Sequence, residues 1–163
     1  MIAEQLEDPV IECSTLLTEV LAPLGRVYAE ALLSGPPDQR LTLAQYRILS
    51  YLDERDHLSS ELARYLAVTP SSITTTVDVL VSRGLAERIA APNDRRCIRV
   101  RATPAGLACL ERARARMVAR AGDVVRRLES RDRQRLVEGL TALRAALADG
   151  MNGRPAERTG RRG

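Results

Sequence analysis

Residues 59–106 restrict the fold of this chain more than any other stretch. Taken in order, they predict a short helix, a tight turn, a second helix, a strand, a basic turn, another strand and the start of a further helix. Apolar residues recur every three or four positions in the predicted helices and every second position in the clearer strand. This order is typical of a helix-turn-helix followed by a two-stranded wing, which places one helix in the major groove of DNA.

The second helix of this stretch, residues 70–82, has distinct start and stop signals. Thr69 predicts an N-cap, and Pro70 suits the first helical position, where its missing N–H costs nothing. Gly84 suits the left-handed conformation that commonly ends a helix. One face is apolar and predicts core packing, whereas the other is rich in hydroxyl groups. The residues of that second face that we expect to contact DNA, with modest base selectivity, are Ser71, Ser72, Thr74 and Thr75.

Arginine is concentrated in the predicted wing. Strands are expected at residues 85–89 and 97–101, joined by a turn at residues 92–96. The turn leaves two arginines at the hairpin tip, and period-two alternation puts others on the outer face of the second strand. Such a basic ridge suits contacts to phosphates and to a narrow minor groove. The arginines assigned to DNA contact are Arg83, Arg95, Arg96 and Arg99.

Here the sequence resembles the multiple-antibiotic-resistance regulator (MarR) family over about residues 10–148. The residues that carry the resemblance lie in four short motifs, at 41–49, 83–85, 94–96 and 103–106. In that family the wing aspartate braces an arginine and the tip arginine enters the minor groove. The resemblance therefore implies that Asp94 braces and that Arg96 or Arg95 inserts. The family usually has an arginine near the middle of the recognition helix, where this chain has Thr75 or Thr76, and a leucine where it has Ala102.

Long helices are expected at both ends of the chain. Apolar periodicity predicts a helix at residues 9–33, which Pro23 should kink or interrupt. Thr42 and Gln45 predict a capping box for a helix ending near residue 53. Helices at 103–128 and from Ser130 follow, and the last carries a leucine stripe formed by Leu136, Leu140, Leu143 and Leu147. The stripe either packs within one chain or, as we favour, joins two subunits, since the first and last helices form the dimer in the resembled family.

These segments predict a mainly α fold with a small β-wing (α+β), a winged helix-turn-helix with long N- and C-terminal dimerisation helices. Residues 1–8 are expected to be a flexible N-terminus, and residues 9–40 and 103–148 the dimerisation helices. Residues 41–102 would form the DNA-binding lobe. Residues 149–163, which contain glycine, proline and arginine without apolar periodicity, predict a disordered Arg-rich tail.

Composition excludes several classes of function. Net charge is +4 and the chain contains no lysine, so arginine supplies every basic side chain; this permits nucleic-acid binding without requiring it. The three cysteines are too far apart for a metal-ligand pattern, and no nucleophile–base constellation is present, so neither an enzyme nor a cofactor is expected. The only histidine, His57, is expected to be an exposed turn residue. Without a signal peptide or a run of about 18 apolar residues, the protein is expected to be cytoplasmic.

The resemblance implies a homodimer that binds a pseudo-palindromic operator in double-stranded DNA, most simply as a repressor. It also implies a small aromatic or phenolic effector between the dimer helices and the DNA-binding lobe, where Tyr28 and Tyr46 either line the pocket or are ordinary core residues. Some relatives sense peroxides through a cysteine near Cys13, which is otherwise a small buried apolar residue. The alternative from another class is a winged-helix module for protein–protein contact, which the arginine-poor recognition helix favours.

Overall fold

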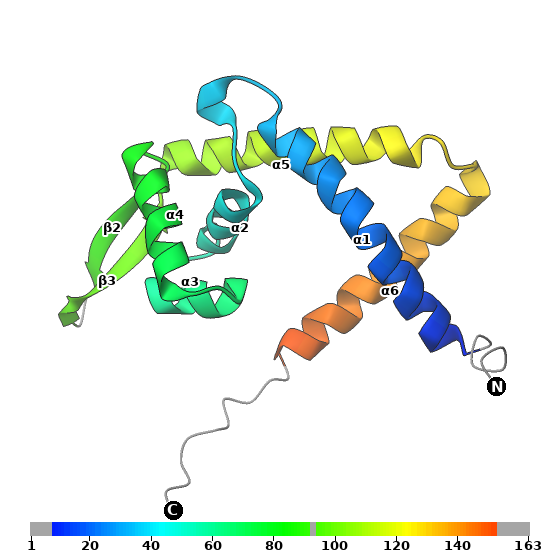
Figure 1. Cartoon of the computed structure of the whole chain (residues 1–163), viewed down its shortest axis with the longest axis horizontal. Coiled ribbons are helices and arrows are strands. Elements are labelled where there is room, and N and C mark those ends of the chain that lie inside the picture. Colours follow the sequence, from blue (N-terminus) through cyan, green and yellow to red (C-terminus); the bar gives the residue numbers. More distant parts are fainter. Residues whose placement is uncertain (1–7, 92–93, 153–163) are drawn as a thin grey trace, which may run out of the picture. The chain divides into compact units, whose positions relative to one another are not determined.

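The computed structural model describes residues 8–91 and 94–152, with the backbone alone at 91, 94–97 and 149–152. The described residues divide into two compact units, the first ending at Ala121 and the second beginning at Gly122; Figure 1 shows the elements of both. The first unit holds most of the helices and all of the described strands. Its order of elements is the predicted one: a long helix, a second helix, the helix-turn-helix, a β-hairpin and another long helix.

Helix α1 (Pro9–Leu33) begins where the sequence predicts, because the Asp8 carboxylate accepts a hydrogen bond from the Val10 N–H at 2.9 Å. The predicted interruption at Pro23 is wrong, since the helix continues through that residue. The fixed φ of proline suits a helix, and the loss of one hydrogen bond does not end a helix of this length. A short 3-10 turn, η2 (Pro37–Gln39), follows within the connection to the second helix.

Helix α2 (Leu43–Leu52) has the predicted capping box. The Gln45 N–H donates to Thr42 Oγ1 at 3.2 Å, and the Thr42 N–H donates to Gln45 Oε1 at 2.9 Å. Helix α3 (Ser59–Leu66) ends at Ala67, which has a left-handed φ of 54°. Helix α4 (Pro70–Ser82) then begins at the predicted Thr69 cap. The two consecutive helices and the short turn between them form the predicted helix-turn-helix.

The wing is a hairpin of β2 (Ala86–Ala91) and β3 (Asp94–Ala102), and both strands extend further than predicted. Antiparallel pairing reaches the Ala91–Asp94 pair, so the backbone of residues 94–96 belongs to a strand and not to the predicted turn. Residues 92–93 lie outside the described part of the chain. A third strand, β1 (His57–Leu58), pairs with the other edge of β3 and gives the order β1-β3-β2. Its two residues are too few for period-two alternation to predict.

Aliphatic side chains from every element around α4 build the core of the first unit. The apolar face of α4 is buried as predicted, and it packs with residues of α2, α3, β3 and α5 (Pro104–Val125). The residues with essentially no exposed surface in this core include Ile48, Leu49, Leu62, Ile73, Val77, Leu80, Val100 and Leu110. This packing fixes which face of α4 remains exposed, and that face is the hydroxyl-rich one.

The prediction that His57 is an exposed turn residue is wrong, because its side chain is only 2 % exposed. Its ring stacks on Tyr51 with a centroid separation of 3.9 Å, and Tyr51 stacks in turn on Tyr65. Its Nδ1 lies 3.2 Å from Glu61 Oε2, the same oxygen that accepts the Leu58 N–H at 2.9 Å. The ring is buried because His57 lies in strand β1, and no local pattern of the sequence predicts that strand.

Glu61 makes the stability of this lobe pH-dependent. The hydrogen bond from the Leu58 N–H is the main cause that lowers the pKa of the Glu61 carboxyl from its usual 4.5, and the contact with His57 lowers it further. A carboxyl whose pKa is lower in the folded state stabilises the fold above its unfolded pKa, and this contribution is lost as the pH falls through the folded pKa. We therefore expect Glu61→Gln to lower the free energy of unfolding at neutral pH by about 1 kcal/mol.

Urea unfolding across a pH series would check this. The difference between Glu61→Gln and the wild type should begin to narrow as the pH falls below about 4.5, where the Glu61 carboxyl of the unfolded chain takes up a proton, and should disappear below the lowered pKa of the folded state. The exposed Glu54→Gln, in the turn before β1, is the matched control. A difference that stays constant down to the acid limit of folding would contradict this role of the charge.

Helix α6 (Ser130–Asn152) belongs to the second unit and extends past the predicted start of the tail at residue 149. A single glycine, Gly150, costs a helix only about 1 kcal/mol, so backbone hydrogen bonds continue through it. Residues 153–163 of the predicted tail, like residues 1–7 of the predicted N-terminus, lie outside the described part. In the single chain Leu136, Leu140 and Leu147 of the leucine stripe are exposed.

Candidate nucleic-acid interface

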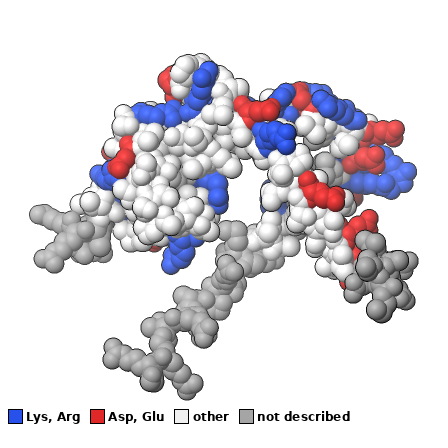
Figure 2. Space-filling view, in the orientation of Figure 1, with Lys and Arg blue, Asp and Glu red and all other residues white. Residues whose placement is uncertain are grey.

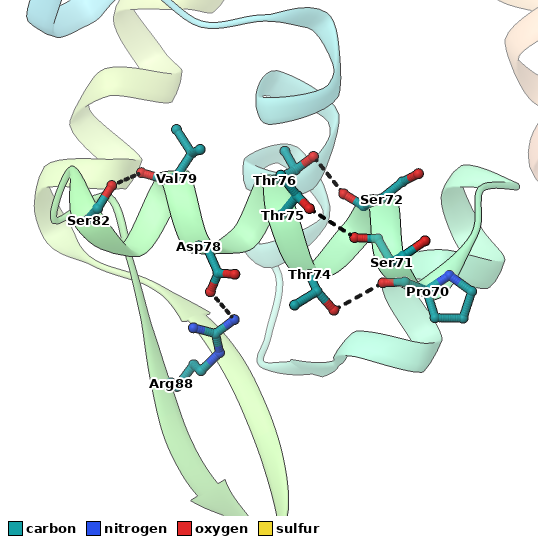
Figure 3. A network of polar contacts seen from close by, with 10 residues as sticks. All are labelled: Pro70, Ser71, Ser72, Thr74, Thr75, Thr76, Asp78, Val79, Ser82 and Arg88. Atoms are coloured by element: carbon teal, nitrogen blue, oxygen red, sulfur yellow. Dashed lines mark hydrogen bonds and ion pairs between the residues drawn. The ribbon is translucent and has the colours of Figure 1, made fainter.

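The exposed face of α4 is lined by hydroxyl groups with a defined orientation (Figure 3). Three consecutive threonines donate to the backbone carbonyl four residues earlier: Thr74 to Pro70 at 3.0 Å, Thr75 to Ser71 at 3.2 Å and Thr76 to Ser72 at 2.9 Å. Since each hydroxyl proton is used within the helix, the group offers an oxygen lone pair and a methyl group to an approaching molecule. Thymine methyl groups and cytosine amino groups complement such a surface.

The N-terminus of α4 gathers three further hydroxyls. Thr69 Oγ1 caps the helix by accepting from the Ser72 N–H at 3.4 Å, and lies 3.0 Å from Ser71 Oγ and 2.9 Å from Ser72 Oγ. All three residues are exposed. Helix N-termini attract anions because their first N–H groups lack partners within the helix. Ser71 and Ser72 thus lie at the end of α4 that favours anions, and their contact with DNA stays a prediction.

Helix α4 carries an acidic residue, whereas DNA-binding helices commonly carry basic residues. Residues 70–82 contain no lysine or arginine, and their one charged residue is Asp78. Asp78 Oδ1 forms an ion pair with Arg88 Nη2 of β2 at 2.7 Å, which ties the helix to the wing (Figure 3). Figure 2 shows the winged lobe as largely uncharged on the face drawn, with separate arginines. Positive charge for phosphate binding must therefore come from elements around α4.

Two of the arginines assigned to DNA contact have partners inside the protein. Arg83 donates from Nη2 to the carbonyls of Asp38 and Arg40, at 2.9 and 2.8 Å. Arg99 donates from Nη2 to the carbonyl of Asp56 at 2.6 Å. The structure thus places both guanidinium groups against loops of their own chain, an arrangement that sequence spacing cannot reveal.

Asp56 is the anchor of β3 that sequence reasoning missed. Its carboxylate accepts two hydrogen bonds of 2.8 Å from Arg101, a bidentate pair. The hydrogen bond from Arg101 is the main cause that lowers the pKa of the Asp56 carboxyl. Together with the contact from Arg99, this pair holds the turn before β1 against the wing. The predicted outer basic face of β3 is therefore partly used to stabilise the lobe.

The three wing residues at 94–96 form strand backbone, with Asp94 opposite Ala91. Their side chains lie outside the described part of the chain. The predicted brace by Asp94 and the predicted insertion of Arg95 or Arg96 therefore remain predictions. Figure 1 shows the hairpin extending beside α4, the placement that a wing requires.

The remaining candidate residues are dispersed over the first unit. Tyr28 is half-buried on α1, and Tyr46 is half-buried on α2, where it packs against the core. Cys13 is exposed on α1 in the single chain. Its interpretation as a small buried apolar residue required a buried side chain. Among the described residues, no group of His, Cys, Asp or Glu side chains could hold a metal ion. The described helices include none with the length and hydropathy needed to cross a membrane.

A helix-turn-helix with an exposed second helix, followed by an antiparallel hairpin, defines the winged-helix class of DNA-binding folds. Within that class, residues 41–96 match the model of the MarR family, so the predicted resemblance is confirmed. No curated protein matches the chain.

Solved structures agree with this fold along most of the chain. RV1404 from Mycobacterium tuberculosis superposes with a TM-score of 0.73 at 25 % identity, covering 93 % of this chain and 99 % of its own. Apo MarR from E. coli has a TM-score of 0.68 at 24 % identity, covering 80 % and 95 %. A cysteine-to-serine variant of E. coli MarR in complex with operator DNA has a TM-score of 0.60 at 26 % identity, covering 82 % and 93 %. The chain therefore has the fold of MarR-family transcription regulators.

Proposed function

We propose that this protein is a homodimeric, sequence-specific DNA-binding regulator that represses transcription. The observation that carries the proposal is the exposed hydroxyl face of α4, supported from behind by a packed apolar face and flanked by the β2–β3 hairpin. In this class of fold that face enters the major groove while the wing contacts the backbone or the minor groove. The solved complex of E. coli MarR with operator DNA supports the same use of this chain.

Exposed apolar surface supports the homodimer. Along α1, the side chains of Val10, Leu16, Leu17, Val20 and Leu21 are between 46 % and 71 % exposed. In α6, Val137, Leu140 and Leu147 are between 54 % and 59 % exposed. Extended apolar faces of this kind usually mark an interface. A second copy would cover them and would place two α4 helices about 34–36 Å apart, the separation of successive major grooves.

Release by a small aromatic compound completes the proposal, with Tyr28 and Tyr46 as candidate lining residues. Both are half-buried in the first unit and present rings that an aromatic molecule could stack on. Hydrogen bonding to Glu111, to Asp53 and, less strongly, to Tyr46 raises the pKa of Arg114. A ligand at Tyr46 would therefore meet a charged side chain as well as a ring.

A winged-helix module for protein–protein contact is the second candidate. It is favoured by the composition of α4, which has no basic residue and whose one charged residue is the acidic Asp78. Fluorescence anisotropy separates the two candidates, using duplexes from the gene's own upstream region with an unrelated duplex as competitor. Binding that survives the competitor and weakens with salt supports the regulator. Absence of binding at low salt supports the protein-contact module.

The wing should supply much of the affinity. We expect Arg95→Ala and Arg96→Ala each to weaken DNA binding and to lower the slope of log affinity against log salt by about one unit for each phosphate contact that the substitution removes. Arg127→Ala, which removes the same charge from the second unit, is the control and should change neither quantity. Affinity and salt slope that remain at wild-type values in both wing variants would refute the assignment of the wing.

A further inference from the structure

The loop between α1 and α2 is held by an arginine at the end of the candidate recognition helix. Arg83, the residue that follows α4, reaches the loop with its guanidinium group. Its Nη2 donates to the carbonyls of Asp38 and Arg40, and its Nη1 donates to Gln45 Oε1 at 3.3 Å. Gln45 is the buried residue of the α2 capping box. One side chain thus connects α4 to both the loop and the start of α2.

A second arginine holds the same loop from α5. Arg116 donates from Nε to the carbonyl of Ala31, in the last turn of α1, at 3.2 Å, and from Nη2 to the carbonyl of Gln39 at 2.9 Å. Its side chain also lies against Gly35, where an added Cβ would meet it at 3.7 Å and where the φ of +96° already favours glycine. The carbonyls in the last turn of α1 lack helical donors, and the Ala31 carbonyl accepts from both Arg116 and the Ser34 hydroxyl, at 2.8 Å from the latter.

The two ends of the loop are fixed in the core. Leu32 and Leu41 have no exposed surface, and the Leu41 N–H donates to the carbonyl of Leu32 at 3.1 Å. Within the loop, Arg40 Nε donates to the carbonyl of Gly35 at 3.0 Å. The loop is thus closed at its base, and its carbonyls at Asp38, Gln39 and Arg40 accept hydrogen bonds from Arg83 and Arg116, which couples its position to these two arginines. Displacement of α1 would therefore be transmitted to α4 through Arg83.

We propose that Arg83 is a positioning residue that sets the separation of the two recognition helices in the dimer, by tying α4 to the loop that leaves the dimerisation helix α1. The proposal rests on the proposed function, because a dimer on two half-sites is required. Arg83 then acts on DNA binding through geometry and not through a phosphate contact. Arg116 supplies the corresponding bond to α5.

Half-site spacing tests this role. The duplex preferred by the wild type, selected from a random pool, is altered by adding or removing single base pairs between its half-sites, each a shift of about 3.4 Å. We expect the wild type to lose about tenfold in affinity for each change, because the two helices no longer fit both grooves. Arg83→Met should discriminate by less than about threefold while binding an isolated half-site normally. Arg83→Lys, which keeps a cationic donor without the planar fork, should lie between them.

The salt slope distinguishes the two roles of Arg83. If the residue acts by positioning, Arg83→Met keeps the wild-type slope, as does the control Arg112→Met, which removes an exposed arginine of α5. A slope reduced by about one unit, together with retained spacing discrimination, would show a phosphate contact and overturn the proposal.

Hydrogen exchange at the Leu41 amide tests the loop without DNA. The amide should exchange at least about tenfold faster in Arg83→Met than in the wild type and remain protected in Arg112→Met. Unchanged protection would overturn the proposal even if DNA binds. Should the wild type select no duplex at all, the proposed function fails, and faster exchange would still show that Arg83 fixes the position of α4 relative to α1.

Discussion

Gly106→Ala is expected to abolish or severely impair folding of the first unit. Gly106 lies in the first turn of α5, and a Cβ added there would meet the carbonyl oxygen of Leu85 at 2.0 Å and its carbon at 2.9 Å. The obstacle is backbone, which cannot rotate away as a side chain can. The same carbonyl accepts the Thr103 N–H at 3.1 Å, so moving it also breaks the junction between the wing and α5. We expect a loss of about 3 kcal/mol or more in the free energy of unfolding.

Urea unfolding followed by circular dichroism would measure this loss. Gly122→Ala is the matched control on the same helix, because its added Cβ meets only the flexible end of Arg126, at 3.4 Å. That substitution should be neutral or stabilise the helix by up to about 1 kcal/mol. Equal stability of Gly106→Ala and the wild type would contradict a close contact between α5 and the Leu85 carbonyl.

Leu21→Glu is expected to prevent dimerisation and, with it, operator binding. The Leu21 side chain is 71 % exposed in the single chain, so a glutamate there costs the folded subunit little. In a dimer that covers this face, the same carboxylate would be buried without a partner, which costs several kcal/mol. The variant should sediment as a monomer and bind a two-half-site duplex at least about a hundredfold more weakly, since it loses the gain from simultaneous binding.

Thr15→Glu provides the control for this experiment, because it adds the same charge to the exposed polar face of α1. It should leave both the sedimentation coefficient and the affinity close to the wild-type values. Analytical ultracentrifugation and anisotropy on one duplex would measure both variants. A dimeric Leu21→Glu with unimpaired binding would show that α1 is not part of the interface.

The local signals of the sequence predict most of the fold correctly. Thr42, Thr69 and Thr103 each cap a helix, and Gly84 has a φ of +68° at the end of α4. These features depend on residues within four positions of one another, so one sequence suffices to recognise them. The motif at residues 103–106 also carries the family resemblance, and the structure supplies a physical reason for its glycine, because Gly106 lies against the carbonyl of Leu85.

What the sequence could not predict depends on partners far apart in the chain. Arg83 and Asp38 are separated by 45 residues, as are Arg101 and Asp56. Nothing in the spacing of arginines tells which face DNA and which face the protein. His57 is buried because β3 pairs with it, and two strand residues carry no periodicity. Arg83, Arg99 and Arg101 thus have partners within the protein that the spacing of arginines does not reveal, and the expected contacts of the basic ridge with DNA stay a prediction.

The bonds from Thr74, Thr75 and Thr76 to the α4 backbone also affect the thermodynamics of recognition. Side chains held in one rotamer by their own helix lose little conformational entropy when they contact a base. Such a surface discriminates by shape, and its contribution hardly depends on ionic strength, unlike that of arginine contacts to phosphates. In the proposed complex, the contribution of α4 would then persist at salt concentrations that weaken the contacts of the hairpin arginines with phosphates.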